Sequence, residues 1–207
     1  QRIARASVGD LVLTAEYDHD ERELSEIMQM ANRVILSGSP GGGKTTFLLW
    51  TFRELCLRLE QGIVEADQGG VADWVVPIFI ELGNFDANSS LLEMICSHLG
   101  LPPSEHPAAA FTSILDHCSV VLLLDGSNEM PVHQRRKCIS QILELDAKLR
   151  ALDLCDKLTI IVATRPYGFD STRLESEGYE TVTIRPLALE QIETHFCEMV
   201  GQSANQE

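Results

Sequence analysis

A nine-residue stretch between two patterned segments constrains this chain more than any other feature. Residues 38–46 read GSPGGGKTT and satisfy the pattern G-x-x-x-x-G-K-[ST], directly after an apolar run and directly before a segment of helical period. Glycines here let backbone N–H groups turn inward around a phosphate, and the N-terminus of the next helix adds partial positive charge. The pattern predicts a phosphate-binding loop (Walker A), with a glycine-rich turn and a chance lysine as the alternative.

The polar residues of this loop have separate predicted roles. The Lys44 ammonium should bridge the β- and γ-phosphates of a nucleoside triphosphate, and the Thr45 hydroxyl should ligate Mg²⁺. The loop residues expected to bind the nucleotide are Gly38, Ser39, Pro40, Gly41, Gly42, Gly43, Lys44, Thr45 and Thr46.

Short apolar runs alternate with segments of helical period along the chain, which predicts an α/β fold of three layers. The strand-like runs are 34–37, 75–82, 120–125, 158–164 and, more weakly, 181–184. The helical segments are 45–59, 90–99, 108–117 and 134–152, with Ser89 able to cap the second and Gly100 able to end it. Because the apolar runs are continuous rather than alternating, we expect a central, mostly parallel sheet of about five strands covered on both faces.

The ends of the chain carry weaker patterns. Residues 1–32 are interpreted as a linker or helical lead-in, with a short amphipathic helix at 21–32, and residues 33–186 as the core. Residues 187–207 look like the start of a truncated helical extension, with a helix at 189–200. Residues 62–73, rich in Gly and acidic side chains, predict an exposed loop. Since the chain opens without Met, we expect it to be a piece of a longer protein.

Composition narrows the classes of partner. The chain has 16 Lys and Arg against 31 Asp and Glu, a formal charge of −15, which disfavours binding to nucleic acid or to anionic membranes. No apolar run approaches the length of a membrane span. The six cysteines form no CxxC pair, which favours free thiols and a cytoplasmic location over disulfides or a zinc site.

A second motif lies at 120–129, VVLLLDGSNE, where an apolar run ends in acidic residues. Ligands bind at the carboxyl ends of strands in open α/β sheets, so Asp125 should contact Mg²⁺, through water, as a Walker B carboxylate. Glu129 is placed past the Gly126 turn to polarise the attacking water. The alternatives are a turn or cap residue for Asp125 and a solvated loop charge for Glu129.

A third motif, LTIIVATRP at 158–166, ends another buried strand in Thr164 and Arg165 at the same sheet edge. The planar guanidinium of Arg165 suits bidentate recognition of a γ-phosphate. A surface ion pair with an acidic neighbour is the alternative for Arg165.

Four blocks, GSPGGGKTT, VLLLDGSNEMP (121–131), IIVATRPYGF and IRPLALEQIETHF, follow one another in this order. Together they resemble the NACHT domain of the STAND class of signalling NTPases, from about residue 33 to 196. The resemblance implies that Lys44, Thr45, Asp125, Glu129 and Arg165 form the nucleotide site. It also implies that the 158–164 strand lies between the 34–37 and 120–125 strands, with 75–82 at the edge. Many members carry Asp where this chain has Asn128, which leaves Mg²⁺ affinity and hydrolysis rate open.

Three functions are compatible with these motifs. The leading one is a signalling switch that binds ATP, or less favoured GTP, with Mg²⁺ and hydrolyses it slowly, using Lys44, Glu129 and Arg165 as catalytic residues and Thr45 and Asp125 as metal ligands. The resemblance implies further domains in the same longer chain and a nucleotide-dependent homo-oligomer. The alternatives are a turnover P-loop ATPase or kinase, and a scaffold that binds nucleotide without hydrolysis.

Overall fold

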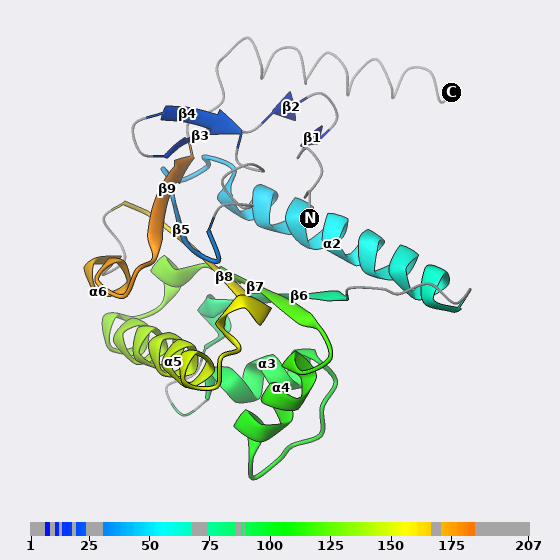
Figure 1. Cartoon of the computed structure of the whole chain (residues 1–207). Helices are drawn as coiled ribbons and strands as arrows, with labels where there is room; N and C mark the ends of the chain where they lie inside the picture. The colour runs from blue at the N-terminus through cyan, green and yellow to red at the C-terminus, as the bar shows by residue number, and fades with distance from the viewer. Residues whose placement is uncertain are drawn as a thin grey trace, which may run out of the picture.

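The computed structural model places most of the chain in one mixed sheet and the helices around it (Figure 1). Its described residues are 7–8, 11–12, 14–17, 20–23, 31–67, 74–85, 88, 90–166 and 171–184. The sheet has seven strands in the order β4-β3-β9-β5-β8-β7-β6. Their bounds are β3 Thr14–Tyr17, β4 Asp20–Glu23, β5 Arg33–Ser37, β6 Val75–Glu81, β7 Ser119–Asp125, β8 Leu158–Thr164 and β9 Glu180–Ile184. Strands β1 (Ser7–Val8) and β2 (Leu11–Val12) form a separate antiparallel pair.

The five strands from β9 to β6 are parallel neighbours, which confirms the expected α/β fold and its sheet of about five parallel strands. Strand β8 lies between β5 and β7, and β6 ends the sheet, as the resemblance implied. Pro77 lies on β6 opposite Val121 of β7, and an edge strand tolerates a residue that cannot donate a ladder hydrogen bond. The parallel register brings the carboxyl ends of β5, β8 and β7 to one edge.

Helices cover both faces of the sheet, giving three layers (Figure 1). Helix α2 (Lys44–Asp67) packs Phe47 and Leu48 on one face, against apolar residues of β5, β7, β8 and β9. Helices α3 (Leu91–His98), α4 (Pro107–Leu115) and α5 (Val132–Ala151) pack on the other face. Shorter helices are α6 (Ser171–Glu175) and the 3₁₀ turns η1 (Leu82–Asn84), η2 (Ser127–Glu129) and η3 (Cys155–Lys157).

Two helix boundaries differ from the sequence predictions. Helix α2 continues to Asp67, so the first part of the loop expected at 62–73 is helical, and 68–73 lie outside the described residues. One interior glycine costs a helix only about 1 kcal/mol relative to alanine, and the strong helix formers Glu60 and Gln61 precede Gly62. Helix α3 is capped by Ser90 rather than Ser89, and the backbone N–H of Ser90 donates to the Glu93 carboxylate at 3.3 Å.

The helix expected at 21–32 is wrong at its start. Residues 21–23 belong to β4, which pairs antiparallel with β3, and β3 pairs antiparallel with β9 through Ala15 opposite Ile184. The β3–β4 hairpin pairs with the edge that β9 offers, and the hydrophobic periodicity of residues 21–32 does not reveal a pairing with so distant a strand. The prediction is also wrong at its end, since residues 31–32 are not helical. Residues 24–30 and the helix expected at 189–200 lie outside the described residues.

A buried ionic cluster joins the beginnings of two central strands to α5, at the sheet edge opposite the glycine-rich loop. Arg33, a residue 7% exposed, donates from Nε to Asp146 Oδ1 at 2.7 Å, and its Nη1 donates to the Leu158 carbonyl oxygen. Arg150 adds a second partner, with Nη2 2.9 Å from Asp146 Oδ2. The cluster fixes where β5 and β8 begin, and hence where their far ends lie.

The described cysteines are all free thiols, as the sequence predicted. Cys96, Cys118 and Cys138 are buried, and burial raises the pKa of Cys138 to about 12. Cys56 and Cys155 are partly exposed.

Candidate functional site

The glycine-rich loop connects the carboxyl end of β5 to the first turn of α2, as predicted. Gly41 and Gly43 have φ values of +73° and +87°, a left-handed region that side-chain-bearing residues rarely adopt. The Gly42 N–H donates to the Ser39 carbonyl oxygen at 3.1 Å, and the Phe47 N–H donates to that of Gly43 at 2.8 Å. The loop is therefore a tight turn whose last glycine opens a helix, the geometry that presents backbone N–H groups to an anion.

Lys44 curls back over this loop. Its Nζ donates to the carbonyl oxygens of Gly38 at 2.7 Å and Ser39 at 2.8 Å. Partial burial lowers the pKa of Lys44, and the nearby Arg165 lowers it further, while Asp125 acts in the opposite direction. Two cations so close together, on a chain with a charge of −15, mark a local site for an anion.

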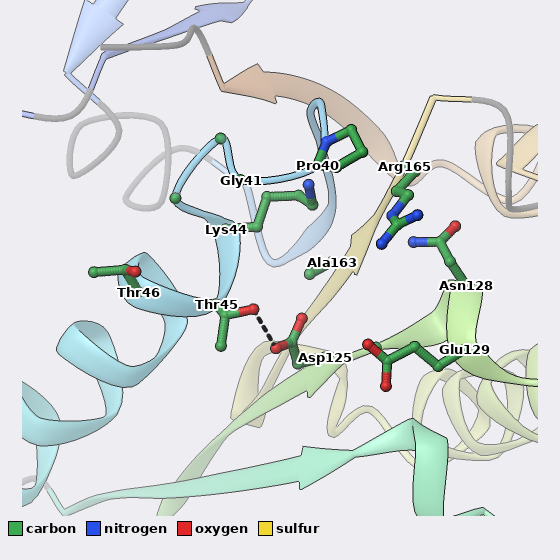
Figure 2. A pocket seen from close by; sticks show the side chains of 13 residues that line it. Pro40, Gly41, Lys44, Thr45, Thr46, Asp125, Asn128, Glu129, Ala163 and Arg165 are labelled. Carbon is green, nitrogen blue, oxygen red and sulfur yellow. Dashed lines mark hydrogen bonds between the residues drawn. The ribbon is translucent and has the colours of Figure 1, made fainter.

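The two predicted metal ligands lie in contact. The Thr45 hydroxyl donates to Asp125 Oδ2 at 2.7 Å, so the first turn of α2 meets the end of β7 across the end of β8 (Figure 2). Mg²⁺ in nucleotide sites is commonly held by one or two protein oxygens, with phosphates and waters completing the octahedron. Among the described residues, no group of three or more His, Cys, Asp or Glu side chains could hold a metal alone. The Thr45–Asp125 pair therefore fits Mg²⁺ that arrives with a phosphate ligand.

A cavity of about 220 Å³ opens between the loop and the strand ends. It is lined by Pro40, Gly41, Gly42, Gly43, Lys44, Thr45, Thr46, Asp125, Gly126, Asn128, Glu129, Ala163 and Arg165. Gly38 and Ser39 do not line it and instead supply the carbonyl oxygens that bind Lys44. The structure thus brings the other predicted site residues together, and adds Gly126, Asn128 and Ala163.

Glu129 ends the η2 turn and is packed against η1, the turn that follows β6. A Cβ atom added to Gly83 of η1 would lie 3.1 Å from Glu129 Oε2, so a side chain at position 83 would push this carboxylate aside by a few tenths of an ångström. Gly126, with φ +76°, makes the sharp turn between Asp125 and η2. The Glu129 side chain is exposed and lines the cavity on the same side as Asp125 (Figure 2).

Arg165 reaches the cavity from the end of β8 and Asn128 reaches it from η2 (Figure 2). The buried Thr164 hydroxyl donates to Asn128 Oδ1 at 3.4 Å, and the fully buried Ser127 hydroxyl donates to the Ala163 carbonyl oxygen at 2.8 Å. The sequence singled out Asn128 only as a departure from a family pattern. Its position three residues after Asp125, past a glycine turn, was the signal that could have placed it at the site.

These features define the class of the protein as a nucleotide-binding P-loop NTPase core: a phosphate-binding loop between β5 and α2 faces the acidic end of β7 within a parallel α/β sheet. A family model of the NACHT domain matches residues 32–203, and the chain belongs to that family.

A solved structure is similar in fold. The ORC2 protein of Aeropyrum pernix, in its ADP form, matches with a TM-score of 0.54 and 12% identity, over 80% of this chain and 45% of that one. The match spans less than half of the ORC2 chain, and at this identity it concerns the fold alone. No curated protein matches the sequence. Within the residues that the structure describes, no helix is long and apolar enough to cross a membrane.

Proposed function

We propose that this chain is the Mg²⁺-dependent ATP-binding core of a signalling switch of the STAND class, which hydrolyses ATP slowly. The observation that carries the proposal is the 2.7 Å hydrogen bond between Thr45 and Asp125, opposite Lys44 in one cavity. A hydroxyl, a carboxylate and an ammonium in this arrangement serve one purpose well, the binding of a metal-chelated polyphosphate.

The chain's own groups account for binding. Backbone N–H groups of the glycine turn and the α2 N-terminus surround the β-phosphate, and Lys44 exchanges its carbonyl partners for oxygens of the β- and γ-phosphates. Thr45 and Asp125 would hold Mg²⁺, which would supply positive charge to offset that of the phosphate oxygens.

Hydrolysis needs a water aimed at the γ-phosphorus. Glu129 faces the cavity beyond Asp125 and can accept a hydrogen bond from that water and then its proton. Arg165 lines the same cavity from the end of β8, and its guanidinium can bind γ-phosphate oxygens where they gain negative charge. Glu129 is therefore proposed to act on the attacking water, and Arg165 on the phosphate that it attacks.

Adenine is favoured over guanine, and the cytoplasm over other compartments. The sequence lacks an Asn-Lys-x-Asp block of the kind that selects guanine in many GTPases. The ORC2 structure, similar in fold, was solved in an ADP form. Free thiols among the described cysteines suit a reducing compartment. Other domains of a longer chain and a second copy are the proposed partners, through which nucleotide state becomes a signal.

Binding is tested by calorimetry of Mg-ATP with the wild type, Lys44→Ala and the control Lys148→Ala, an exposed lysine on α5. Loss of one charge-assisted contact should weaken ATP binding by tenfold or more in Lys44→Ala, on the order of 1.5–3 kcal/mol, and Lys148→Ala should bind as the wild type does. Equal affinity in all three folded proteins would show that this loop does not hold the nucleotide.

Two other functions predict different turnover. A turnover ATPase or kinase should cycle at about 1–100 s⁻¹, and a non-hydrolysing scaffold should release no phosphate even in a single turnover. The scaffold merits testing because Asn128, at the cavity wall, cannot act as a carboxylate base. Single-turnover hydrolysis with a slow steady state supports the switch.

A further inference from the structure

We infer that Asn128 is a triphosphate-specificity residue: its side-chain amide nitrogen donates, beside Arg165, to an oxygen of the γ-phosphate. This inference rests on the proposed function, and it deepens that proposal by naming how the site distinguishes ATP from ADP.

The first observation is the position of the two side chains. Asn128 and Arg165 line the same cavity from η2 and from the end of β8. Figure 2 shows the amide nitrogen of Asn128 turned toward the guanidinium of Arg165. Two groups that can only donate hydrogen bonds thus face each other across one wall of the cavity.

The second observation is that the surrounding structure fixes this orientation. The Thr164 hydroxyl, on a residue only 2% exposed, lies 3.4 Å from Asn128 Oδ1 and 3.2 Å from the Arg165 carbonyl oxygen, so its single proton is shared between these two acceptors on the carbonyl side of the amide. The η2 turn itself is held by the Ser127 hydroxyl, which donates to the Ala163 carbonyl oxygen at 2.8 Å. With its oxygen beside the Thr164 hydroxyl at the end of β8, the amide presents its N–H₂ group to the cavity and to Arg165.

The third observation is that the donors lack an acceptor within the protein. No hydrogen bond or ion pair joins the Arg165 guanidinium to another residue in the described part of the chain, and the amide nitrogen of Asn128 is in the same situation there. An anionic oxygen between them would accept from both, with the charge-assisted strength typical of phosphate contacts. The γ-phosphate supplies such an oxygen, whereas a β-phosphate held in the glycine turn stays at the other wall.

The same geometry explains what an acidic residue would do at this position. A carboxylate at 128 would pair with Arg165 and repel the γ-phosphate, since like charges at close range oppose each other. An amide has nearly the same shape, keeps the hydrogen bond from Thr164 and leaves Arg165 unpaired. Asparagine at 128 therefore favours tight triphosphate binding.

The test compares two nucleotides on four proteins. Mg²⁺ with the non-hydrolysable analogue AMP-PNP, and Mg²⁺ with ADP, are titrated against the wild type, Asn128→Asp, Asn128→Ala and the control His133→Ala, an exposed residue at the start of α5. Asn128→Asp should lose about tenfold or more in AMP-PNP affinity with ADP affinity changed less than about twofold, and Asn128→Ala should lose somewhat less. The control should match the wild type.

Thr164 is the positioning residue, and its role has its own readout. Thr164→Val removes the hydroxyl and should lower the ratio of AMP-PNP to ADP affinity in the wild type, but should have no further effect on that ratio in Asn128→Ala. Thr164→Ser keeps the hydroxyl and should restore the ratio. A purely structural role of Thr164 would change both nucleotides equally in both backgrounds.

The outcomes separate this inference from the function on which it rests. If the wild type binds AMP-PNP and Lys44→Ala does not, but Asn128→Asp keeps the wild-type ratio or gains AMP-PNP affinity, the role of Asn128 is overturned and the proposed function stands. If the wild type binds neither nucleotide, both are overturned. Should Asn128→Asp fail to fold in a thermal melt, Asn128→Ala decides by the same ratio.

Discussion

At the scale of single residues, the two acidic side chains of the site, Asp125 and Glu129, have different surroundings. Asp125 accepts a hydrogen bond from the Thr45 hydroxyl at 2.7 Å, whereas Glu129 is exposed and lies against Gly83 and Gly126. A carboxylate already paired with a metal-ligand hydroxyl suits metal binding, and an exposed one beside it suits interaction with water. Substitutions at these two positions are therefore expected to impair different properties, hydrolysis at Glu129 and Mg²⁺ dependence at Asp125.

Glu129→Gln should keep Mg-ATP affinity within about twofold and lower single-turnover hydrolysis by about 10²–10⁴-fold, because the amide cannot accept a proton. Asp125→Asn should instead raise the Mg²⁺ concentration needed for ATP binding. Quench-flow hydrolysis and Mg²⁺ titrations measure the two effects. Wild-type hydrolysis by Glu129→Gln would remove Glu129 from the reaction.

The ammonium group of Lys44 should make ATP affinity depend on pH. Burial, and then Arg165, lower the pKa of Lys44 in the free protein, and bound phosphates should raise it again. Lys44 therefore contributes fully to binding at pH values below its pKa in the free protein, where it is already protonated. The contribution is lost as the pH rises from that pKa to the higher pKa of Lys44 in the complex. ATP affinity should therefore fall with rising pH over an alkaline range that begins below the ordinary lysine pKa of about 10.4.

The control for this prediction is Lys44→Arg, whose guanidinium stays charged throughout. Its affinity can be lower at every pH, but it should not decline further over the same range. Calorimetry at several pH values in buffers of different ionisation enthalpy also measures proton uptake on binding, which only the wild type should show. Equal slopes for both proteins would contradict a titrating Lys44.

At the scale of elements, strands covered on both faces could be predicted, and elements that depend on a partner could not. The runs of β7 and β8 are continuous and apolar because helices cover both sides, and the sequence located both nearly to the residue. Strands β3 and β4 exist through antiparallel pairing with β9, which is a tertiary contact. The Thr164–Asn128 contact likewise joins residues 36 positions apart, at the ends of neighbouring strands.

The buried ionic cluster gives a prediction about how elements are joined. Asp146→Ala leaves Arg33 charged at 7% exposure without its carboxylate, which should destabilise the fold by about 3–5 kcal/mol and lower Tm by roughly 10 °C. The matched control is Arg53→Ala, which removes the exposed Arg53–Glu54 pair at 3.3 Å and should change stability by less than about 1 kcal/mol.

Urea unfolding and thermal melts of the two variants test this difference. The cluster lies at the sheet edge opposite the nucleotide cavity, so ATP binding at low temperature should survive in folded Asp146→Ala. If both variants lost equal stability, the buried pair would be worth no more than a surface pair.

At the scale of the whole molecule, charge and shape act together. The chain carries a formal charge of −15, yet Lys44 and Arg165 line one cavity at the strand ends. Long-range attraction of a nucleotide is therefore weak, and recognition depends on short-range contacts inside the cavity. Such a site binds best with Mg²⁺ present, because the metal offsets the charge of both protein and phosphates.

The chain alone should be a slow ATPase, well below the roughly 1 s⁻¹ at which efficient kinases begin, and largely monomeric. The reason is exposure: the Glu129 side chain is open to solvent, so an attacking water near it is not held in a dry, closed site. Closure over the cavity by another domain or a second copy would exclude that water and align Arg165. Steady-state phosphate release, with light scattering for mass, measures both properties. Fast turnover that scales linearly with chain concentration and disappears in Lys44→Ala would favour the turnover enzyme over the switch.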